Sequence, residues 1–164
     1  MALRRRIVTK VGDIFEVPLD DQGKKYMQYI ATDQTQLTSS VIRAFKTKYP
    51  LDALPTADDI AKDAVDFYAH TILRQGILQN IWKKVGKSAD LGSLNVWFRG
   101  TNDVMDPKIK VSKNWHVWRI NGPRQKVGEL LGEYQKAEIG SVMIATDIVD
   151  RMKTGKYGFV YPSY

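Results

Sequence analysis

The sequence predicts a strand-rich α+β domain, built as an antiparallel, SH3-like, partly open barrel or a curved sheet with two or three short helices. Three observations predict this class: segments that alternate apolar and polar residues, turn-forming residues between them, and few stretches with helical spacing. The 164 residues are 43% hydrophobic and 26% charged, which is typical of a globular protein. A chain of this length can bury a core without disulfides.

The first predicted element is a β-hairpin. Residues 13–19 and 25–32 both read as strands, and the link at residues 20–23 has the composition of a tight turn. Residues 40–49 alternate again. We therefore expect a third strand to follow the hairpin.

The next part of the chain changes character. Thr56 and Asp59 form an acidic variant of a capping box, which predicts one short helix within residues 50–64. Residues 65–73 favour a strand because they are rich in β-branched and aromatic residues. Gly76 interrupts a helical spacing after this strand, so strand, turn, strand is the predicted order there.

Later segments predict two more strands and one clear helix. The strands lie at residues 94–99 and 114–120, and the apolar residues within 127–134 recur at helical spacing. The last helix is predicted to begin at a cap at residue 146 or 147 and to end at Gly155. We expect residues 157–161 to form a final strand.

The domain organisation is simple. Residues 1–10 are a basic leader that we expect to be partly flexible, and residues 11–164 form a single α+β domain. The chain has no cysteine, so disulfides and thiolate chemistry are excluded. The segment after the leader does not resemble a signal peptide, and no apolar run is long enough to cross a bilayer. We therefore expect a soluble, cytoplasmic protein with no membrane partner.

Charge and tryptophan are distributed unevenly. The net charge is +7, but residues 71–128 alone carry +8, whereas residues 50–70 carry −4. The basic block also contains every tryptophan of the chain: Trp82, Trp97, Trp115 and Trp118. This coincidence of cations and large aromatic rings predicts a surface that faces a macromolecular partner.

Two motifs carry a family resemblance. The sequence VGDIFEVPL at residues 11–19, followed by GKKYMQYI at residues 23–30, resembles the opening of the immunity protein 26 family of bacterial polymorphic toxin systems. The motif WKKVG at residues 82–86 is similar to a later pattern of that family. The resemblance implies a small α+β protein with a barrel-like sheet and no catalytic residues. Its implied partner is a protein toxin, which it binds and neutralises.

Two surfaces are candidates for partner contact. The basic and aromatic set comprises Trp82, Lys83, Lys84, Trp97, Arg99, Trp118 and Arg119. The acidic alternative comprises Asp52, Asp58, Asp59, Asp63 and Asp66. An acidic contact would suit a basic toxin such as a nuclease, whose inhibitors are commonly acidic.

Nucleic-acid binding is the alternative function. Lysines and arginines of the basic block would contact phosphates, and exposed indoles would stack on bases. Trp115 alternates with Val117 and is predicted to lie in the core, whereas Trp97 and Trp118 are candidates for exposure. Burial of Trp118 is at least as strongly favoured, because it shares a strand face with Ile120.

No pattern of catalytic residues emerges. His70 and His116 are far apart in the sequence, and each is predicted to be a packed, hydrogen-bonded side chain. Glu129 and Glu133 have helical spacing and are predicted to line a solvated face. The sequence thus predicts no catalytic residue, metal site or cofactor, and a protein that is not an enzyme.

Overall fold

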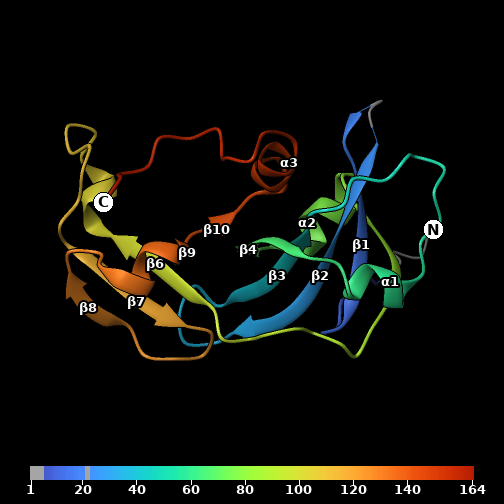
Figure 1. The fold of residues 1–164 in the computed structure, drawn as a ribbon, viewed down its shortest axis with the longest axis horizontal. Helices are drawn as coiled ribbons and strands as arrows, with labels where there is room; N and C mark the ends of the chain where they lie inside the picture. The colour runs from blue at the N-terminus through green and yellow to red at the C-terminus, as the bar shows by residue number, and fades with distance from the viewer. Residues whose placement is uncertain (1–5, 21–22) are drawn as a thin grey trace.

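The computed structural model describes residues 6–20 and 23–164. Two sheets lie side by side along the long axis of the molecule, with the α-helices placed around the larger one (Figure 1). The large sheet has the strand order β10-β4-β3-β2-β1-β5 and consists of β1 (Asp13–Pro18), β2 (Lys24–Asp33), β3 (Ser39–Phe45), β4 (Val65–Thr71), β5 (Lys83–Lys87) and β10 (Val142–Met143).

The small sheet and the helices complete the fold. The small sheet has the order β8-β7-β6-β9 and consists of β6 (Trp97–Thr101), β7 (Trp115–Arg119), β8 (Gln125–Gly128) and β9 (Glu138–Ile139). The helices are α1 (Ala57–Ala61), α2 (Leu73–Leu78) and α3 (Ala145–Thr154), with the 3-10 turns η2 (Asn102–Met105) and η3 (Gly132–Lys136). The predicted α+β class with a curved sheet is confirmed, but neither sheet closes into a barrel.

The first four strands form an antiparallel meander. The predicted hairpin is confirmed, because Leu19 donates its backbone N–H to the carbonyl of Gly23 at 2.8 Å and β1 pairs with β2. Residues 21 and 22 of its link lie outside the described residues. The third strand ends at Phe45, earlier than predicted, because the chain then turns and Lys46 donates to the carbonyl of Ala64.

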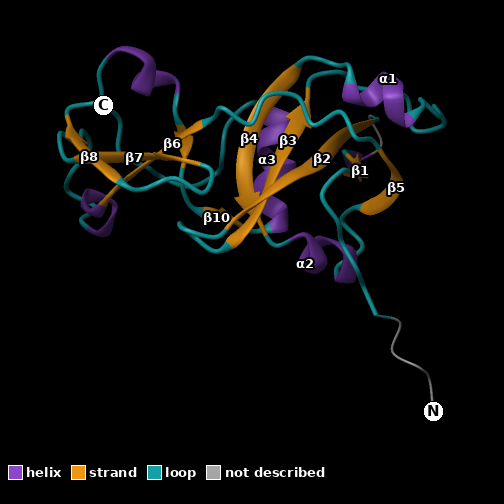
Figure 2. Cartoon of the chain, turned by 90° about the horizontal axis from the view of Figure 1, so that it is seen from below, coloured by secondary structure: helices purple, strands orange, loops and turns teal. Residues whose placement is uncertain are grey.

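Both faces of the large sheet are covered. On one face, Phe15, Met27 and Phe67 pack against Ile148 and Met152 of α3. Figure 2 shows α3 lying against β3 and β4 on this side. Burial of such alternating apolar positions is what selects the register of the strands.

The opposite face of the large sheet is shared by two partners. Near one end, Ile14 and Phe45 pack on Ile60 of α1. Near the other end, Val41 packs with Phe98 of the small sheet, which joins the two sheets through a common apolar cluster. The large sheet therefore contacts α3 on one face, and α1 and the small sheet on the other.

One short segment connects the two sheets. β9 pairs in parallel with β6, and β10, which begins three residues after β9 ends, pairs in parallel with β4. Both sheets are therefore mixed, which corrects the antiparallel prediction. The physical reason is that this segment runs between the sheets and adds one edge strand to each.

The prediction of strand, turn, strand around Gly76 is wrong. Residues 73–78 form α2, and the indole of Trp82 covers Gly76, so that a Cβ at this position would lie 2.0 Å from the ring. Trp82 also donates its Nε1–H to the carbonyl of Leu73 at 3.0 Å. Here the glycine gives room for a close packing contact and does not end the helix.

Two further local predictions are also wrong. Residues 127–134, which have helical spacing, instead form the end of β8 and the start of the 3-10 turn η3. Gly128 ends β8 and Gly132 begins η3, and both have a positive φ. Glu129 and Glu133 therefore share no helical face. Residues 157–161 form no strand and run as an irregular segment across to the small sheet. Its end is held by a bridge between Val111 and Ser163.

The predicted last helix is confirmed as α3, but the predicted cap at residue 146 or 147 is wrong, because both residues lie inside the helix. It begins after Ile144. The carboxylate of Asp147, in the first turn of the helix, accepts the backbone N–H of Ile144 at 3.2 Å and so caps the helix start. It ends at Gly155, which has a φ of 82°.

The N-terminal leader falls partly outside the described residues, since the description begins at residue 6. Residues 6–10 contain neither helix nor strand. No helix in the described part of the chain is both long and apolar enough to span a membrane.

Candidate functional site

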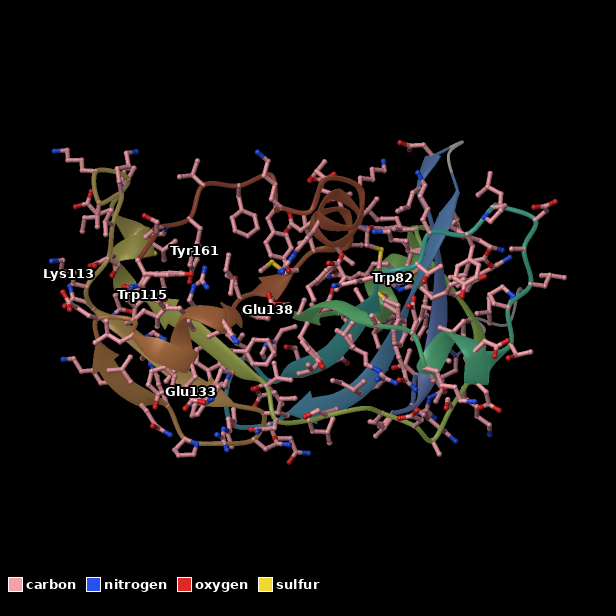
Figure 3. All side chains as sticks on the ribbon, viewed as in Figure 1. Trp82, Lys113, Trp115, Glu133, Glu138 and Tyr161 are labelled. Atoms are coloured by element: carbon pink, nitrogen blue, oxygen red, sulfur yellow. The ribbon has the colours of Figure 1, made fainter. Side chains whose placement is uncertain are left out.

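The tryptophans of the basic block are mostly core residues. Trp82, Trp115 and Trp118 are at most 2% exposed. Each indole N–H donates to a partner inside the molecule: the carbonyl of Leu73, the carbonyl of Ser112 and the carboxylate of Asp33, respectively. Figure 3 places Trp82 within the large-sheet part and Trp115 within the small-sheet part. Trp82 and Trp118 therefore offer no ring surface to a partner, which corrects their place in the predicted contact set.

The remaining basic and aromatic residues do not form a continuous surface. Trp97 is half-buried, with the Arg119 guanidinium 4.3 Å from its ring centre and Tyr134 packed edge-on. Arg99 is half-buried and lines a cavity. The exposed lysines Lys83 and Lys84 lie on β5, in the other sheet.

Those two lysines are already paired. Lys84 lies 2.9 Å from the carboxylate of Asp13, and Lys83 lies 3.5 Å from that of Glu16. Both acceptors belong to β1. Exposed ion pairs of this kind contribute little stability, but they reduce the positive field available to a distant anion.

The acidic candidates are better placed for contact. Asp52, Asp58 and Asp59 are exposed, and Asp63 is half-buried. We call residues 51–63 the acidic segment. Within the described residues, none of these four carboxylates forms an ion pair with a cationic nitrogen within 4.0 Å. The segment lies at the end of the molecule opposite to the small sheet, as the position of α1 shows (Figures 1 and 2).

Asp66 is separate from the acidic segment. It is exposed on β4 and lines a different hollow, together with Glu133 and Glu138. The five predicted carboxylates therefore divide into four that belong to one segment and one that does not.

Exposed leucines accompany the acidic segment. Leu54 is 92% exposed and Leu51 is 48% exposed, so two large apolar side chains lie among carboxylates. Sequence reasoning missed them, although the signal was present: neither leucine fits the period of a strand or a helix. Apolar side chains rimmed by charge are the usual composition of a protein-docking surface.

The second half of the acidic segment, residues 56–63, is firmly anchored. Thr56 caps α1 by accepting the backbone N–H of Asp59 at 3.1 Å, which confirms the predicted capping residue. Asp63 accepts the backbone N–H of Thr47 at 2.9 Å. Ile60 is 2% exposed and is packed against the large sheet. A surface held in this way loses little conformational entropy when a partner binds.

A buried arginine ties the acidic segment to the sheet. Arg43 is 3% exposed and donates to the carbonyls of Ala61 at 3.1 Å and Asp90 at 2.8 Å. Its Nε donates to Gln28 at 2.9 Å, and Gln28 donates in turn to the carbonyl of Gly12. Burial lowers the pKa of Arg43, so these acceptors supply the stabilisation that water would otherwise give.

A second buried polar group lies where the sheets meet. His70 and Asp33 are fully buried, and their Nε2 and Oδ2 atoms lie 2.9 Å apart. Burial lowers the pKa of His70, although Asp33 opposes the shift, so the neutral imidazole donates to the carboxylate. His70 is thus the packed, hydrogen-bonded residue that the sequence predicted. Solvent does not reach the imidazole of His70, because the residue is fully buried.

The second histidine is half-buried. Its ring stacks on Trp118, with ring centres 5.7 Å apart, and its Nδ1 accepts from Arg124 at 2.8 Å. Burial, and then the charge of Arg124, lower the pKa of His116 to about 4. The described residues contain no group of three His, Asp or Glu side chains placed to hold a metal ion.

These two histidines predict how stability depends on pH. In the unfolded chain both imidazoles titrate near pH 6.5, whereas in the folded chain their pKa is lowered, so acidification protonates the unfolded state first. We expect the free energy of unfolding, measured in urea, to fall between pH 7 and pH 5. The variant His116→Phe should lose less, by on the order of 1 kcal/mol after allowance for solvent screening. An equal loss in both proteins would contradict this assignment.

Comparisons with known proteins gave no match to a family model, to a curated protein or to a solved structure. The resemblance to the immunity protein 26 family therefore stays a prediction from the two sequence motifs.

Proposed function

We propose that this chain is a non-enzymatic protein of the immunity type, which docks a basic protein toxin on its acidic segment and so neutralises it. The observation that carries the proposal is Leu54, 92% exposed within a segment whose carboxylates have no cationic partner in the described residues. A basic protein surface offers what this segment lacks: cations for the carboxylates and apolar cover for the leucines.

The positive net charge of the chain is compatible with this docking. At physiological ionic strength the Debye length is about 8 Å, so a docked partner responds to the charges close to the contact. The acidic segment contains four aspartates and one lysine, a net charge of −3, and the small sheet lies at the far end of the molecule (Figure 1). The charges close to the contact, more than the net charge of +7, therefore determine which partner can dock.

The test uses the products of the reading frames that adjoin the gene. We expect the chain to rescue cells from one of these products and to bind it in a purified mixture. Leu54→Asp should weaken this binding by about 30-fold or more, which is the effect of losing a central apolar anchor.

A matched control is available at the other end of the molecule. Leu131 is 63% exposed and follows β8, so Leu131→Asp introduces the same charge on a leucine outside the acidic segment. It should leave binding and rescue unchanged. Equal weakening by both variants, or failure of every neighbouring product to bind the parent chain, would refute the proposal.

Nucleic-acid binding has less support from the same geometry. Three of the four indoles are buried, so they cannot stack on bases. Binding to mixed oligonucleotides that weakens steeply as salt rises would nevertheless favour this alternative and count against toxin neutralisation.

A further inference from the structure

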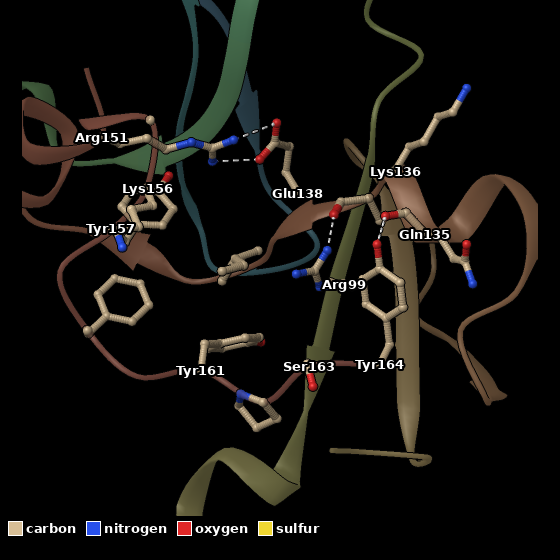
Figure 4. A pocket seen from close by; sticks show the side chains of 15 residues that line it. Arg99, Gln135, Lys136, Glu138, Arg151, Lys156, Tyr157, Tyr161, Ser163 and Tyr164 are labelled. Atoms are coloured by element: carbon tan, nitrogen blue, oxygen red, sulfur yellow. Dashed lines mark hydrogen bonds and ion pairs between the residues drawn. The ribbon is translucent and has the colours of Figure 1, made fainter. Parts of the chain in front are cut away.

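A second candidate site lies between α3 and the small sheet, where residues 155–164 run from one to the other. They close a cavity of about 490 Å³ against Arg99 of β6, Glu138 of β9 and Arg151 of α3 (Figure 4). Four separate parts of the chain meet there. A volume of this size falls within the range of small-molecule sites.

Arg99 is the unusual residue of this cavity. Its Nη1 donates to the carbonyl of Ala137 at 2.6 Å, and its Nε is buried without a hydrogen-bond partner. In the described part of the chain, no carboxylate lies within 4.0 Å of its guanidinium, since the ion pairs formed there do not include it. A partly desolvated guanidinium without a counter-ion is costly, and a bound anion would remove that cost.

Burial makes the charge of Arg99 costly, and the neighbouring aromatic residues offset only part of this cost. Burial lowers the pKa of Arg99, and Tyr161 and Tyr164 oppose the shift. The guanidinium lies 5.3 Å from the ring centre of Tyr164 and 5.5 Å from that of Trp115. These rings hold the planar cation in place through cation–π contacts.

The second arginine of the cavity is already neutralised. Arg151 makes a bidentate ion pair with Glu138, with contacts of 2.7 and 3.3 Å. This pair cancels the one acidic side chain of the lining. Lys136 and Lys156, both exposed, add two further cations at the rim. The cavity therefore carries a net positive charge centred on Arg99.

Aromatic rings form the opposite wall. Tyr157 and Phe159 are stacked, with ring centres 5.1 Å apart and planes at 12°, and Phe159 lies edge-on to Tyr161. Figure 4 shows Arg99, Tyr157 and Tyr161 around the same open space. Such a wall accepts a flat ring, just as the guanidinium accepts an oxyanion.

We infer that this cavity binds a phosphate monoester that carries a flat heterocycle, of the nucleoside monophosphate class, with the phosphate on Arg99 and the ring against the tyrosine wall. This inference does not depend on the acidic segment, which lies at the other end of the molecule.

The experiment is a calorimetric titration of the full chain with adenosine 5′-monophosphate, adenosine and inorganic phosphate. We expect the monophosphate to bind, inorganic phosphate to bind at least tenfold more weakly, and adenosine to bind more weakly still. Arg99→Gln should weaken monophosphate binding at least tenfold, because a charge-assisted, bidentate contact is lost. Tyr161→Leu should weaken the monophosphate but not inorganic phosphate.

Arg119→Gln is the matched control, because Arg119 is exposed and lies outside the cavity over Trp97. It should bind the monophosphate as the parent chain does, and Leu54→Asp should do so as well. A melting curve shows that each variant is folded, and Arg99→Lys, which keeps the charge, should show an intermediate affinity. The inference is overturned if the parent chain binds no monophosphate at 10 mM, which is roughly tenfold above a weak Kd of 1 mM. It is also overturned if Arg99→Gln binds as the parent does, or if inorganic phosphate binds as tightly as the monophosphate.

Discussion

Asp33→Ala should lower the free energy of unfolding by about 4 kcal/mol, a loss large enough to unfold a marginally stable domain. The Asp33 side chain is fully buried and joins the two sheets. Its Oδ2 accepts from His70 at 2.9 Å and from the indole of Trp118 at 3.2 Å, while Oδ1 accepts the backbone N–H of Asn121 at 3.2 Å. Alanine would leave the buried donors of His70 and Trp118 unsatisfied, at a cost of about 1–3 kcal/mol each.

The pKa of this carboxyl group predicts how the effect of Asp33→Ala depends on pH. Burial alone would raise the pKa of Asp33, but the hydrogen bonds from His70, Gln36 and Asn121 outweigh it and lower the pKa. The carboxylate therefore stabilises the fold at neutral pH, and this contribution is lost as the pH falls below about 4. Asp33→Ala should remove that part of the acid sensitivity.

Urea unfolding followed by tryptophan fluorescence measures the effect, since Trp118 contacts the replaced group. Asp52→Ala is the control, because Asp52 is exposed, and its effect should remain within about 0.5 kcal/mol. A loss below about 1 kcal/mol for Asp33→Ala would show that the junction between the sheets does not depend on this carboxylate.

Gly76→Ala should destabilise the domain by about 3 kcal/mol, although alanine is the better helix former by about 1 kcal/mol. The new Cβ would lie 2.0 Å from the Trp82 ring, which is only 2% exposed and packs in the core of the large sheet. The indole would have to leave its position and give up its hydrogen bond to Leu73. A red shift of the fluorescence should accompany the loss of stability.

A double-mutant cycle separates packing from backbone effects. In the background of Trp82→Ala, the substitution at Gly76 should cost nothing or be slightly favourable, because no ring remains to be displaced. Gln75→Ala, at the exposed neighbouring position of α2, should have little effect in either background. An equal cost of Gly76→Ala with and without Trp82 would contradict the packing explanation.

The sequence predicted those parts of the fold that depend on neighbours in the chain. The hairpin, the cap at Thr56 and the end of α3 at Gly155 follow from a few adjacent residues. Burial of Trp115 followed from the alternation of one strand. α2 could not be predicted in this way, because the ring that makes Gly76 tolerable comes six residues later.

In the candidate sites too, features set by neighbouring residues could be predicted and features set by distant residues could not. The carboxylates of the acidic segment were recognised from their composition, but the exposure of Leu54 depends on how the segment lies on the large sheet. The cavity at Arg99 could not be predicted, because its walls come from residues far apart in the sequence and from residues 157–161, which were expected to form a strand. Alternation alone does not distinguish a strand from an extended segment that packs its rings on another element.

The pairing of β10 with β4 has a consequence for how the protein is made. β4 ends at Thr71, but β10, which pairs with His70 and Thr71 at its edge, ends only at Met143. At ribosomal rates of about 5–20 residues per second, this edge would stay open for about 4 to 14 s during synthesis. An open strand edge is a template for pairing with another chain. Nascent chains of this protein should therefore be most prone to association before residues 142–143 have emerged.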